Sequence, residues 1–218
     1  MRVVIAGGHG KIALALERLL SQRGDSVAGL IRNPAQASDL EAAGAEAIVV
    51  DLENSSVAEV ARSLHGADAV VFAAGAGPGS GAARKDTVDR AAAVLLADAA
   101  IEAGVLRYLM ISAMGADRRA DDETYDPVFA AYLRAKAAAD EEVLARAELQ
   151  TTVVRPGHLT DESGTGRVAL APSTGRGSVP RRDVAAVLVA VLDAPETVGH
   201  TFELISGETP IADAVAAL

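Results

Sequence analysis

The chain has 218 residues and a formal charge of −10, from 20 Lys and Arg against 30 Asp and Glu, and it contains no Cys. Half of the residues are hydrophobic, which is enough to build a core, and the length suits one domain. The negative charge argues against a general role on nucleic acids or anionic membranes. The lack of Cys excludes disulfides, thiolate zinc sites and iron–sulfur clusters.

Targeting and metal signals are weak in this sequence. The first residues do not have the pattern of a signal or transit peptide, and the longest apolar stretch, residues 184–192, is less than half of a membrane span. We therefore expect a soluble, cytoplasmic protein. The four His have no spacing typical of metal ligands, so we expect no metal site.

Short β-branched runs alternate with Ala-rich amphipathic stretches along the chain, which predicts βαβ units around a parallel sheet. The expected strands cover residues 3–6, 27–31, 47–50, 69–73, 108–112, 152–155 and 202–205. The expected helices begin near residues 10, 35, 55, 83, 124, 182 and 210. Residues 161–180 do not fit this alternation and suggest one short strand at 167–170. Loops beyond the carboxyl ends of parallel strands bind ligands, so we expect residues 157–182 to lie on the substrate side.

A glycine-rich turn follows the first expected strand and opens the first helix, with the sequence GGHGKIA over residues 7–13. Such a turn lets a pyrophosphate approach the backbone, and the helix offers unpaired N–H groups and the positive end of its dipole. The alternative is a tight strand-to-helix turn with no ligand. The context favours nucleotide binding. The expected cofactor-binding residues in this turn are Gly7, Gly8, His9, Gly10, Lys11 and Ile12.

The residues at the end of the second expected strand indicate which dinucleotide would bind. A protein that binds NAD usually has an acidic residue there for the ribose 2′-hydroxyl, but this chain has Arg32 followed by Asn33. A guanidinium suits a 2′-phosphate, so the sequence favours NADP(H) over NAD(H). The alternative is a solvated arginine in a loop.

The next two expected strands end in further candidates. Asp51 and Leu52 close the third strand, and Asp51 could border the adenine or could cap a turn. Ala73, Ala74 and Gly75 close the fourth strand and are small enough to pass beside the ribose and phosphates.

Tyr132 and Lys136 are four residues apart in the expected long helix after the fifth strand, so both side chains lie on one helix face. A fixed cation beside a phenol favours phenolate and would lower the pKa of the tyrosine. The alternative is a core aromatic residue and a solvated lysine. Random placement would give only ~0.04 such pairs in a chain of this composition, so the pair is a useful signal.

The whole chain resembles the short-chain dehydrogenase/reductase superfamily, in particular its small atypical, NmrA-like NAD(P)-binding branch with epimerase/dehydratase-type relatives. The motifs that carry the resemblance are GGHGKIA, RNP, DL, FAAGAG, MISAMGAD, YLRAK and RPGHLT. The resemblance implies a doubly wound parallel sheet of about seven strands, the Rossmann fold, as a single NAD(P)-binding domain over residues 1–218.

The resemblance also implies roles for individual residues. Tyr132 would be the acid/base at the substrate oxygen, and Lys136 would hold the nicotinamide ribose while lowering the pKa of Tyr132. Ser112 would hydrogen-bond the substrate oxygen. Asp89 stands where many relatives have an active-site Asn. Beside the nicotinamide, the resemblance places Pro156, Gly157 and His158.

Two functions remain open from the sequence. The first is an NADP(H)-dependent oxidoreductase or epimerase acting on a small carbonyl or hydroxyl substrate. The second is a non-catalytic NADP(H)-binding redox sensor or regulatory protein, favoured by Asp89 and by the lack of a separate substrate domain. The partner expected in either case is a small molecule and neither nucleic acid nor membrane. The chain could be a monomer or a homodimer.

Overall fold

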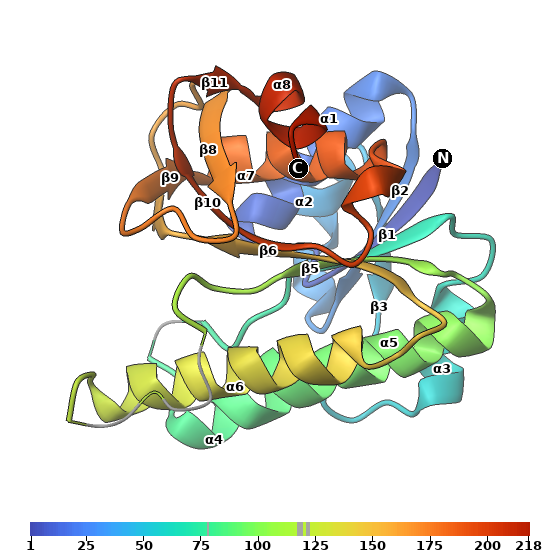
Figure 1. Cartoon of the computed structure of the whole chain (residues 1–218). Coiled ribbons are helices and arrows are strands. Elements are labelled where there is room, and N and C mark those ends of the chain that lie inside the picture. The colour runs from blue at the N-terminus through green and yellow to red at the C-terminus, as the bar shows by residue number, and fades with distance from the viewer. Residues whose placement is uncertain (78, 117–119, 121–122) are drawn as a thin grey trace.

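A computed structural model describes residues 1–77, 79–116, 120 and 123–218. Its centre is a sheet of nine strands in the order β11-β8-β10-β6-β5-β4-β1-β2-β3 (Figure 1). The seven strands from β10 to β3 are parallel, which confirms the predicted sheet. They are β1 (Arg2–Ala6), β2 (Ser26–Ile31), β3 (Glu46–Val49), β4 (Ala69–Phe72), β5 (Arg107–Ile111), β6 (Gln150–Pro156) and β10 (Thr201–Ser206).

The sheet is larger than the sequence predicts because two short strands extend its C-terminal edge. β8 (Arg167–Ala171) pairs antiparallel with β10, and β11 (Thr209–Pro210) pairs antiparallel with β8. β8 covers the edge of β10 that would otherwise be unpaired. Two further strands, β7 (His158–Thr160) and β9 (Ser178–Pro180), form a separate parallel pair. The region 157–182 is therefore more regular than the sequence suggests.

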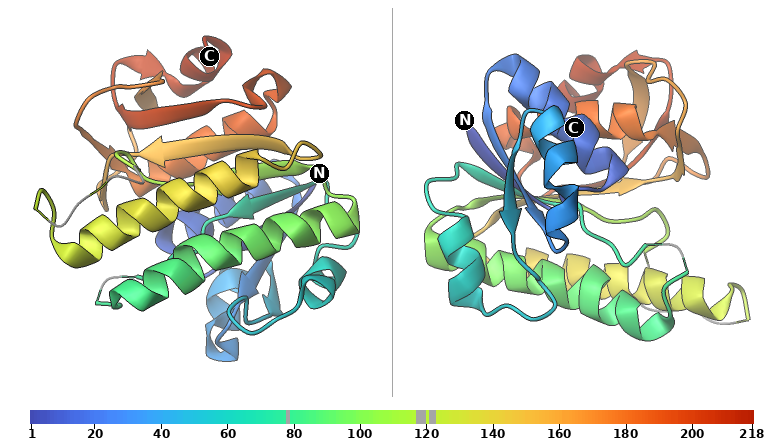
Figure 2. Two further views of the ribbon diagram at one scale, coloured as in Figure 1. Left: turned by 60° about the horizontal axis from the view of Figure 1, so that its bottom comes forward. Right: turned by 180° about the vertical axis from the view of Figure 1, so that it is seen from behind.

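Helices cover both faces of the sheet, as in a doubly wound fold (Figures 1 and 2). One face carries α1 (Lys11–Arg23), α2 (Ala37–Ala42), α7 (Arg181–Leu192) and α8 (Ile211–Ala216). The other face carries α3 (Val57–Ser63), α5 (Ala92–Ala103) and α6 (Pro127–Leu144). The short helical turns are η1 (Pro34–Gln36), α4 (Ala82–Arg84) and η3 (Pro195–Thr197), and a π-helical segment, η2, covers Lys85–Ala91.

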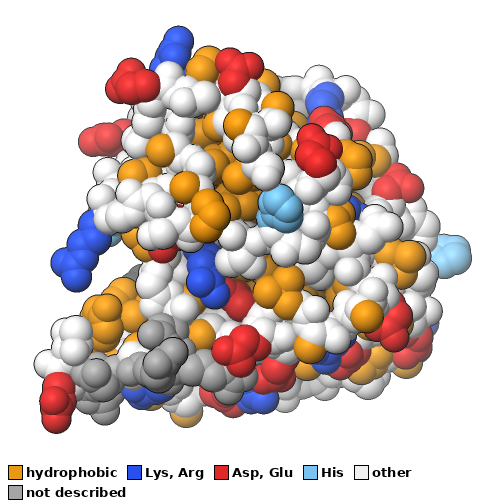
Figure 3. Space-filling model, in the orientation of Figure 1, with side chains coloured by type: hydrophobic (Ala, Val, Ile, Leu, Met, Phe, Trp, Pro, Cys, Tyr) orange, Lys and Arg blue, Asp and Glu red, His pale blue; other side chains and the backbone are white. Residues whose placement is uncertain are grey.

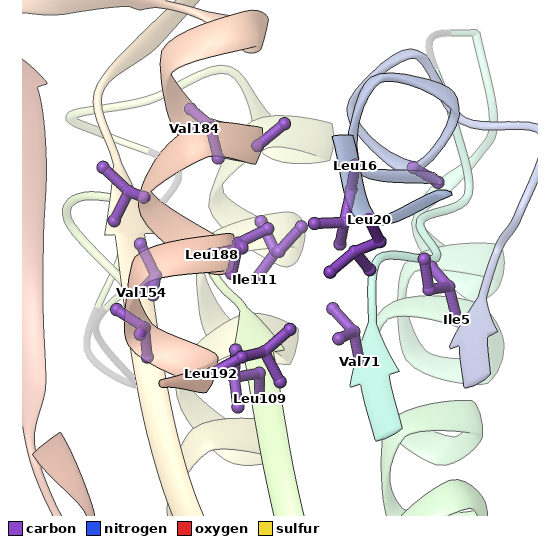
Figure 4. Packing of buried hydrophobic residues seen from close by; sticks show 14 of the residues in the cluster. Ile5, Leu16, Leu20, Val71, Leu109, Ile111, Val154, Val184, Leu188 and Leu192 are labelled. Carbon is purple, nitrogen blue, oxygen red and sulfur yellow. The ribbon is translucent and has the colours of Figure 1, made fainter. Parts of the chain in front are cut away.

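The core has one layer on each side of the sheet. On the α1/α7 side, Leu16 and Leu20 of α1 meet Leu188 of α7 above the side chains of the central strands, such as Ile5 and Val71 (Figure 4). The described residues contain no helix long and apolar enough to cross a bilayer. Acidic and basic side chains are interspersed over the face that Figure 3 shows.

Local signals in the sequence explain where several helices begin. Ser56 and Glu59 form a capping box at the start of α3, and Asp126 accepts hydrogen bonds from two backbone N–H groups at the start of α6. Pro127 at the first position of α6 suits this start. The π-helical turn of η2 is a finding that the sequence does not predict, and it lies directly beside the candidate site.

Arg107 connects the sheet to the C-terminal end of α7. Its guanidinium donates to the carbonyl oxygens of Gln150 and Val191 at 2.8 Å each, and to the hydroxyls of Thr152 at 2.8 Å and Thr197 at 3.1 Å. Burial lowers the pKa of Arg107 to about 10, so the side chain remains charged at neutral pH. A cation at the last turn of α7 also complements the helix dipole.

We expect Arg107→Met to lower the free energy of unfolding by about 2 kcal/mol, because it leaves buried acceptors without a charged donor. Urea unfolding would measure the loss. Arg62→Met, which removes an exposed guanidinium from the end of α3, is the matched control and should change stability by less than about 0.5 kcal/mol. Equal effects of the two substitutions would contradict a structural role for Arg107.

Candidate functional site

A pocket of about 430 Å³ lies at the carboxyl ends of the central strands, where the strand order reverses between β1 and β4. Its lining includes many of the residues that the sequence predicts for a cofactor. These are Gly7, His9, Gly10, Arg32, Asn33, Asp51, Leu52, Ala73, Ala74 and Gly75. The lining also includes residues that the sequence analysis did not assign to the cofactor, namely Leu30, Ile31, Gln36, Val50, Glu53, Arg84, Val88 and Ala92.

The glycine turn has the geometry that close backbone approach requires. Gly7 has a φ of +79°, and a Cβ there would lie 2.6 Å from the Cα of Ala74. Gly10 precedes α1 and lines the pocket, and it has no side chain that could cap the helix. The first N–H groups of α1 therefore remain available for a ligand at this end of the helix. Gly8 has a different role, because a Cβ there would lie 2.8 Å from the Cα of Gly29 in β2. Gly8 thus sets how closely the turn packs on the sheet and does not line the pocket.

These features fit a dinucleotide. The glycine turn and the start of α1 can accept a pyrophosphate. The carboxyl ends of β1, β2 and β4 give the pocket small residues beside polar ones. The helix-start N–H groups supply positive potential, and the lining adds the cations Arg32 and Arg84 beside the carboxylates Asp51 and Glu53.

Three charged residues meet at one side of the pocket. Arg32 Nη1 and Arg84 Nη2 both donate to Oε2 of Glu53, at 2.8 and 2.6 Å. The hydroxyl of Thr87 donates to the other carboxylate oxygen at 2.9 Å. Arg84 is a charged residue at a helix start, and only the fold brings it to Arg32. No sequence signal marks Glu53.

Asp51 caps a turn, as one of the two interpretations of the sequence predicts, and its place in the pocket lining keeps the role beside the adenine as a prediction. It lines the pocket, and its carboxylate accepts hydrogen bonds from the backbone N–H of Glu53 at 3.0 Å and the side-chain amide of Asn54 at 2.8 Å. These bonds lower the pKa of Asp51 and fix the turn after β3. His9 is held in a similar way, since its Nε2 lies 2.7 Å from a carboxylate oxygen of Asp39.

A second cluster lies between η2 and α6. Lys136 is only 3% exposed, and its Nζ donates to the carbonyl of Ile111 at 3.1 Å and lies 3.5 Å from Oδ1 of Asp89. Asp89 also accepts a hydrogen bond at 3.3 Å from the backbone N–H of Ala76, next to Gly75 of the pocket. The π-helical turn therefore brings a buried carboxylate between the β4 loop and the lysine. Lys136 Nζ lies 6.0 Å from the ring centre of Tyr132.

Ser112 belongs to the same cluster but is engaged differently from what the resemblance implies. Its hydroxyl donates to Oδ2 of Asp140 at 2.8 Å, and Arg155 donates to the same oxygen at 2.9 Å. Asp140 lies four residues after Lys136 on α6 and is 1% exposed. The spacing of Tyr132, Lys136 and Asp140 could have revealed this third member of the helix face.

The protonation of Tyr132 differs from the prediction. Burial raises the pKa of Tyr132 above its ordinary value, and the charges of Asp89 and Asp140 raise it further. Burial also lowers the pKa of Lys136, although the same two carboxylates oppose this effect. The expected lowering of the tyrosine pKa is absent because burial has the largest effect on the phenol and the charges of Asp89 and Asp140 act in the same direction. Tyr132 is thus a protonated phenol at neutral pH.

Several predicted residues lie outside the pocket. Ile12 packs against the hydrophobic core. Lys11 contacts Asp161, which also accepts a hydrogen bond from Arg181 at 2.6 Å. The pocket lining also excludes all four predicted catalytic residues, Asp89, Ser112, Tyr132 and Lys136, and the residues Pro156, Gly157 and His158. Gly157 packs against Gly177, because a Cβ there would lie 2.4 Å from the carbonyl oxygen of Gly177.

Comparison with known proteins assigns the site to a class. The glycine turn, the switch-point pocket and the sheet order define a nucleotide-binding Rossmann protein. A sequence model of the NAD(P)H-binding family matches residues 7–195. The chain therefore belongs to the NAD(P)H-binding family, and the resemblance to its NmrA-like, epimerase/dehydratase-type members is confirmed.

Relatives match the chain over its full length. It is 38% identical over 219 residues to the uncharacterized sugar epimerase YhfK of Bacillus subtilis, with all of both chains covered. A solved protein from Bacillus halodurans, named for the NAD-dependent epimerase/dehydratase class, is 36% identical over all of both chains with a TM-score of 0.91. The oxidoreductase ylbE of Lactococcus lactis is 26% identical with a TM-score of 0.86, over 100% of this chain and 96% of its own.

Proposed function

We propose that this protein is an NADP(H)-dependent oxidoreductase or epimerase that acts on a small carbonyl or hydroxyl substrate. The observation that carries the proposal is the buried Lys136 on the same face of α6 as Tyr132, directly behind the loop that ends the cofactor pocket. Burying an ammonium group is costly unless it is paired, and here Asp89 and the carbonyl of Ile111 supply the partners that keep Lys136 near Tyr132. The names of the relatives, an epimerase and an oxidoreductase, support the same reaction classes.

The nicotinamide ring supplies the hydride chemistry when it is bound. In this proposal Tyr132 donates a proton to the carbonyl oxygen of the substrate, and its raised pKa, which keeps the phenol protonated at neutral pH, supports that role. Asp89 holds the ammonium group of Lys136 near the tyrosine and the β4 loop. The hydroxyl of Ser112 donates its hydrogen bond to Asp140, so toward a substrate its oxygen can accept a hydrogen bond.

Arg32 carries the proposed preference for NADP(H). It lines the pocket at the end of β2, where the ribose 2′ position lies in dinucleotide-binding Rossmann folds. We expect NADPH to bind at least tenfold more tightly than NADH, and Arg32→Ala to remove most of that difference. Calorimetric titration would measure both affinities. Arg62→Ala, far from the pocket, should leave them unchanged. Equal affinities in the native protein would contradict this preference.

A sensor that binds NADP(H) without turnover is the second candidate. The engagement of the Ser112 hydroxyl by Asp140 favours it, because that hydroxyl is then not free to donate to a substrate carbonyl. Turnover separates the two functions. The native protein should oxidise NADPH in the presence of at least one compound in a panel of aldehydes, ketones, quinones and flavins. Tight NADPH binding with no oxidation across the panel would favour the sensor.

A further inference from the structure

The cluster of Arg32, Arg84 and Glu53 has an arrangement that the glycine turn does not explain. The three residues come from three separate segments, and all of them line the pocket. One carboxylate oxygen of Glu53 accepts from both guanidinium groups, and Thr87 holds the other oxygen. Glu53 therefore keeps two like charges side by side that would otherwise repel each other.

The carboxylate of Glu53 is ionised in this arrangement. Burial opposes its ionisation, but hydrogen bonds from Arg84 and Thr87 and the charges of the two arginines outweigh that effect and lower the pKa of Glu53. Its side chain is 21% exposed, against 57% for Arg32 and 43% for Arg84. The guanidinium groups thus lie further out than the acid that joins them.

The cluster has a net charge of +1, from two guanidinium groups and one carboxylate. Each guanidinium has five N–H donors, and the bonds to Glu53 use one nitrogen of each. Donors remain on both arginines for a second anion. A phosphate monoester has the charge and the several acceptor oxygens to use them.

We propose that Arg84 is a second ligand of the 2′-phosphate beside Arg32, and that Glu53 limits the preference for NADP(H) over NAD(H). This inference rests on the proposed function and names the residues that regulate its cofactor choice. Glu53 positions the two arginines, but its negative charge repels the arriving phosphate. Removing that charge while keeping an acceptor oxygen should therefore strengthen binding of the phosphorylated cofactor.

Glu53→Gln keeps the shape and one acceptor oxygen of the side chain and removes the charge. We expect it to lower the Kd for NADPH and for 2′-AMP about tenfold, and to change the Kd for NADH less than about twofold. Arg84→Gln should raise the Kd for NADPH about tenfold and leave the Kd for NADH within about twofold. Calorimetric titration of purified protein with NADPH, NADH and 2′-AMP measures all of these values.

Matched controls exist on the neighbouring helical segment. Asp86→Asn removes one exposed negative charge that pairs with Arg90 and not with the pocket arginines, so it should leave every Kd within about twofold. Thermal unfolding without ligand verifies that each variant is folded. If Arg84→Gln does not fold, Arg84→Lys replaces it, and the loss of the fork geometry should still weaken NADPH binding.

Three results would overturn the inference. The first is weaker NADPH binding in Glu53→Gln, which would show that the charge is needed to hold the arginines. The second is an equal change for NADPH and NADH in either variant. The third is unchanged NADPH affinity in Arg84→Gln. Equal affinities of the native protein for NADPH and NADH would contradict only the proposed NADP(H) preference. The changes in Kd that the Glu53 and Arg84 variants cause would still decide the roles of these two residues.

Discussion

Between about pH 5 and pH 7.5, the free energy of unfolding of the native protein should fall by about 3 kcal/mol because of Glu17. This fall should be absent in Glu17→Gln. Glu17 lies in α1 with no exposed surface, and among the described residues neither of its carboxylate oxygens has a hydrogen-bond partner. Its carboxyl packs beneath the glycine turn, since a Cβ on Gly8 would lie 3.1 Å from Oε1 of Glu17. Burial raises the pKa of Glu17 to about 8.

The sign of this effect follows from proton binding. Between the ordinary pKa of Glu and the raised value, the folded chain holds a proton on Glu17 that the unfolded chain has released. The stabilisation that Glu17 contributes is therefore fully present below the ordinary pKa of Glu. It is lost as the pH rises through the raised pKa of the folded state. Each pH unit in this window costs about 1.4 kcal/mol.

Urea unfolding of both proteins at several pH values would measure the difference. Other titrating groups contribute to both curves, so the quantity of interest is the variant's stability minus the native stability, which should grow with pH. Glu102→Gln, an exposed position on α5, is the matched control and should run parallel to the native curve. A parallel curve for Glu17→Gln itself would show that the carboxyl is ionised at no cost in the folded state.

Tyr132→Phe should lower the rate of NADPH oxidation on an accepted substrate by about 10²- to 10⁴-fold, because the phenylalanine cannot donate a proton. The Kd for NADPH should remain within about twofold, since the loss falls on the chemical step. The raised pKa of Tyr132 also predicts that the tyrosine does not titrate between about pH 6 and pH 9, so it adds no pH dependence to the reduction rate in that range.

Tyr125→Phe is the control for this prediction, because Tyr125 belongs to the same aromatic group and its ring lies 5.7 Å from that of Phe129. We expect full activity in this variant. A Tyr132→Phe protein that oxidises NADPH at the native rate would remove the tyrosine from the mechanism. Another proton donor, such as the group that Ser112 and Asp140 form, would then have to be tested.

The parallel sheet was predictable because its strands are buried on both faces and therefore apolar at consecutive positions. The strand predicted at residues 167–170 is confirmed as β8, but its pairing and β11 were harder to predict, because they depend on an open edge at β10 that is created only in the fold. The π-helical turn has no sequence signature either. It is recognised only in the structure, where the extra residue of the π-helical turn directs Asp89 to the buried side of the helix.

The glycine turn and the Tyr132–Lys136 pair were readable because each is a local pattern with a fixed spacing. Glu53 and Arg84 are 31 positions apart and meet only across the pocket, so no local pattern connects them. The pKa of Tyr132 could not be derived from the pair alone. It depends first on the burial of the phenol and then on the charges of Asp89 and Asp140, and both the burial and the approach of Asp89 are produced by tertiary packing.

The contact between Gly157 and Gly177 limits which positions of the proposed substrate side, residues 157–182, can be varied. A Cβ on Gly177 would lie 2.8 Å from the side chain of Ile205, and His158 donates its backbone N–H to the carbonyl of Gly177 at 2.8 Å. A Cβ on Gly157 would meet backbone, which no rotamer change can relieve, whereas a Cβ on Gly177 would require the Ile205 side chain to move. A mutagenesis library that tests the proposed substrate side should hold these two positions constant and vary the side chains between β7 and β9 instead.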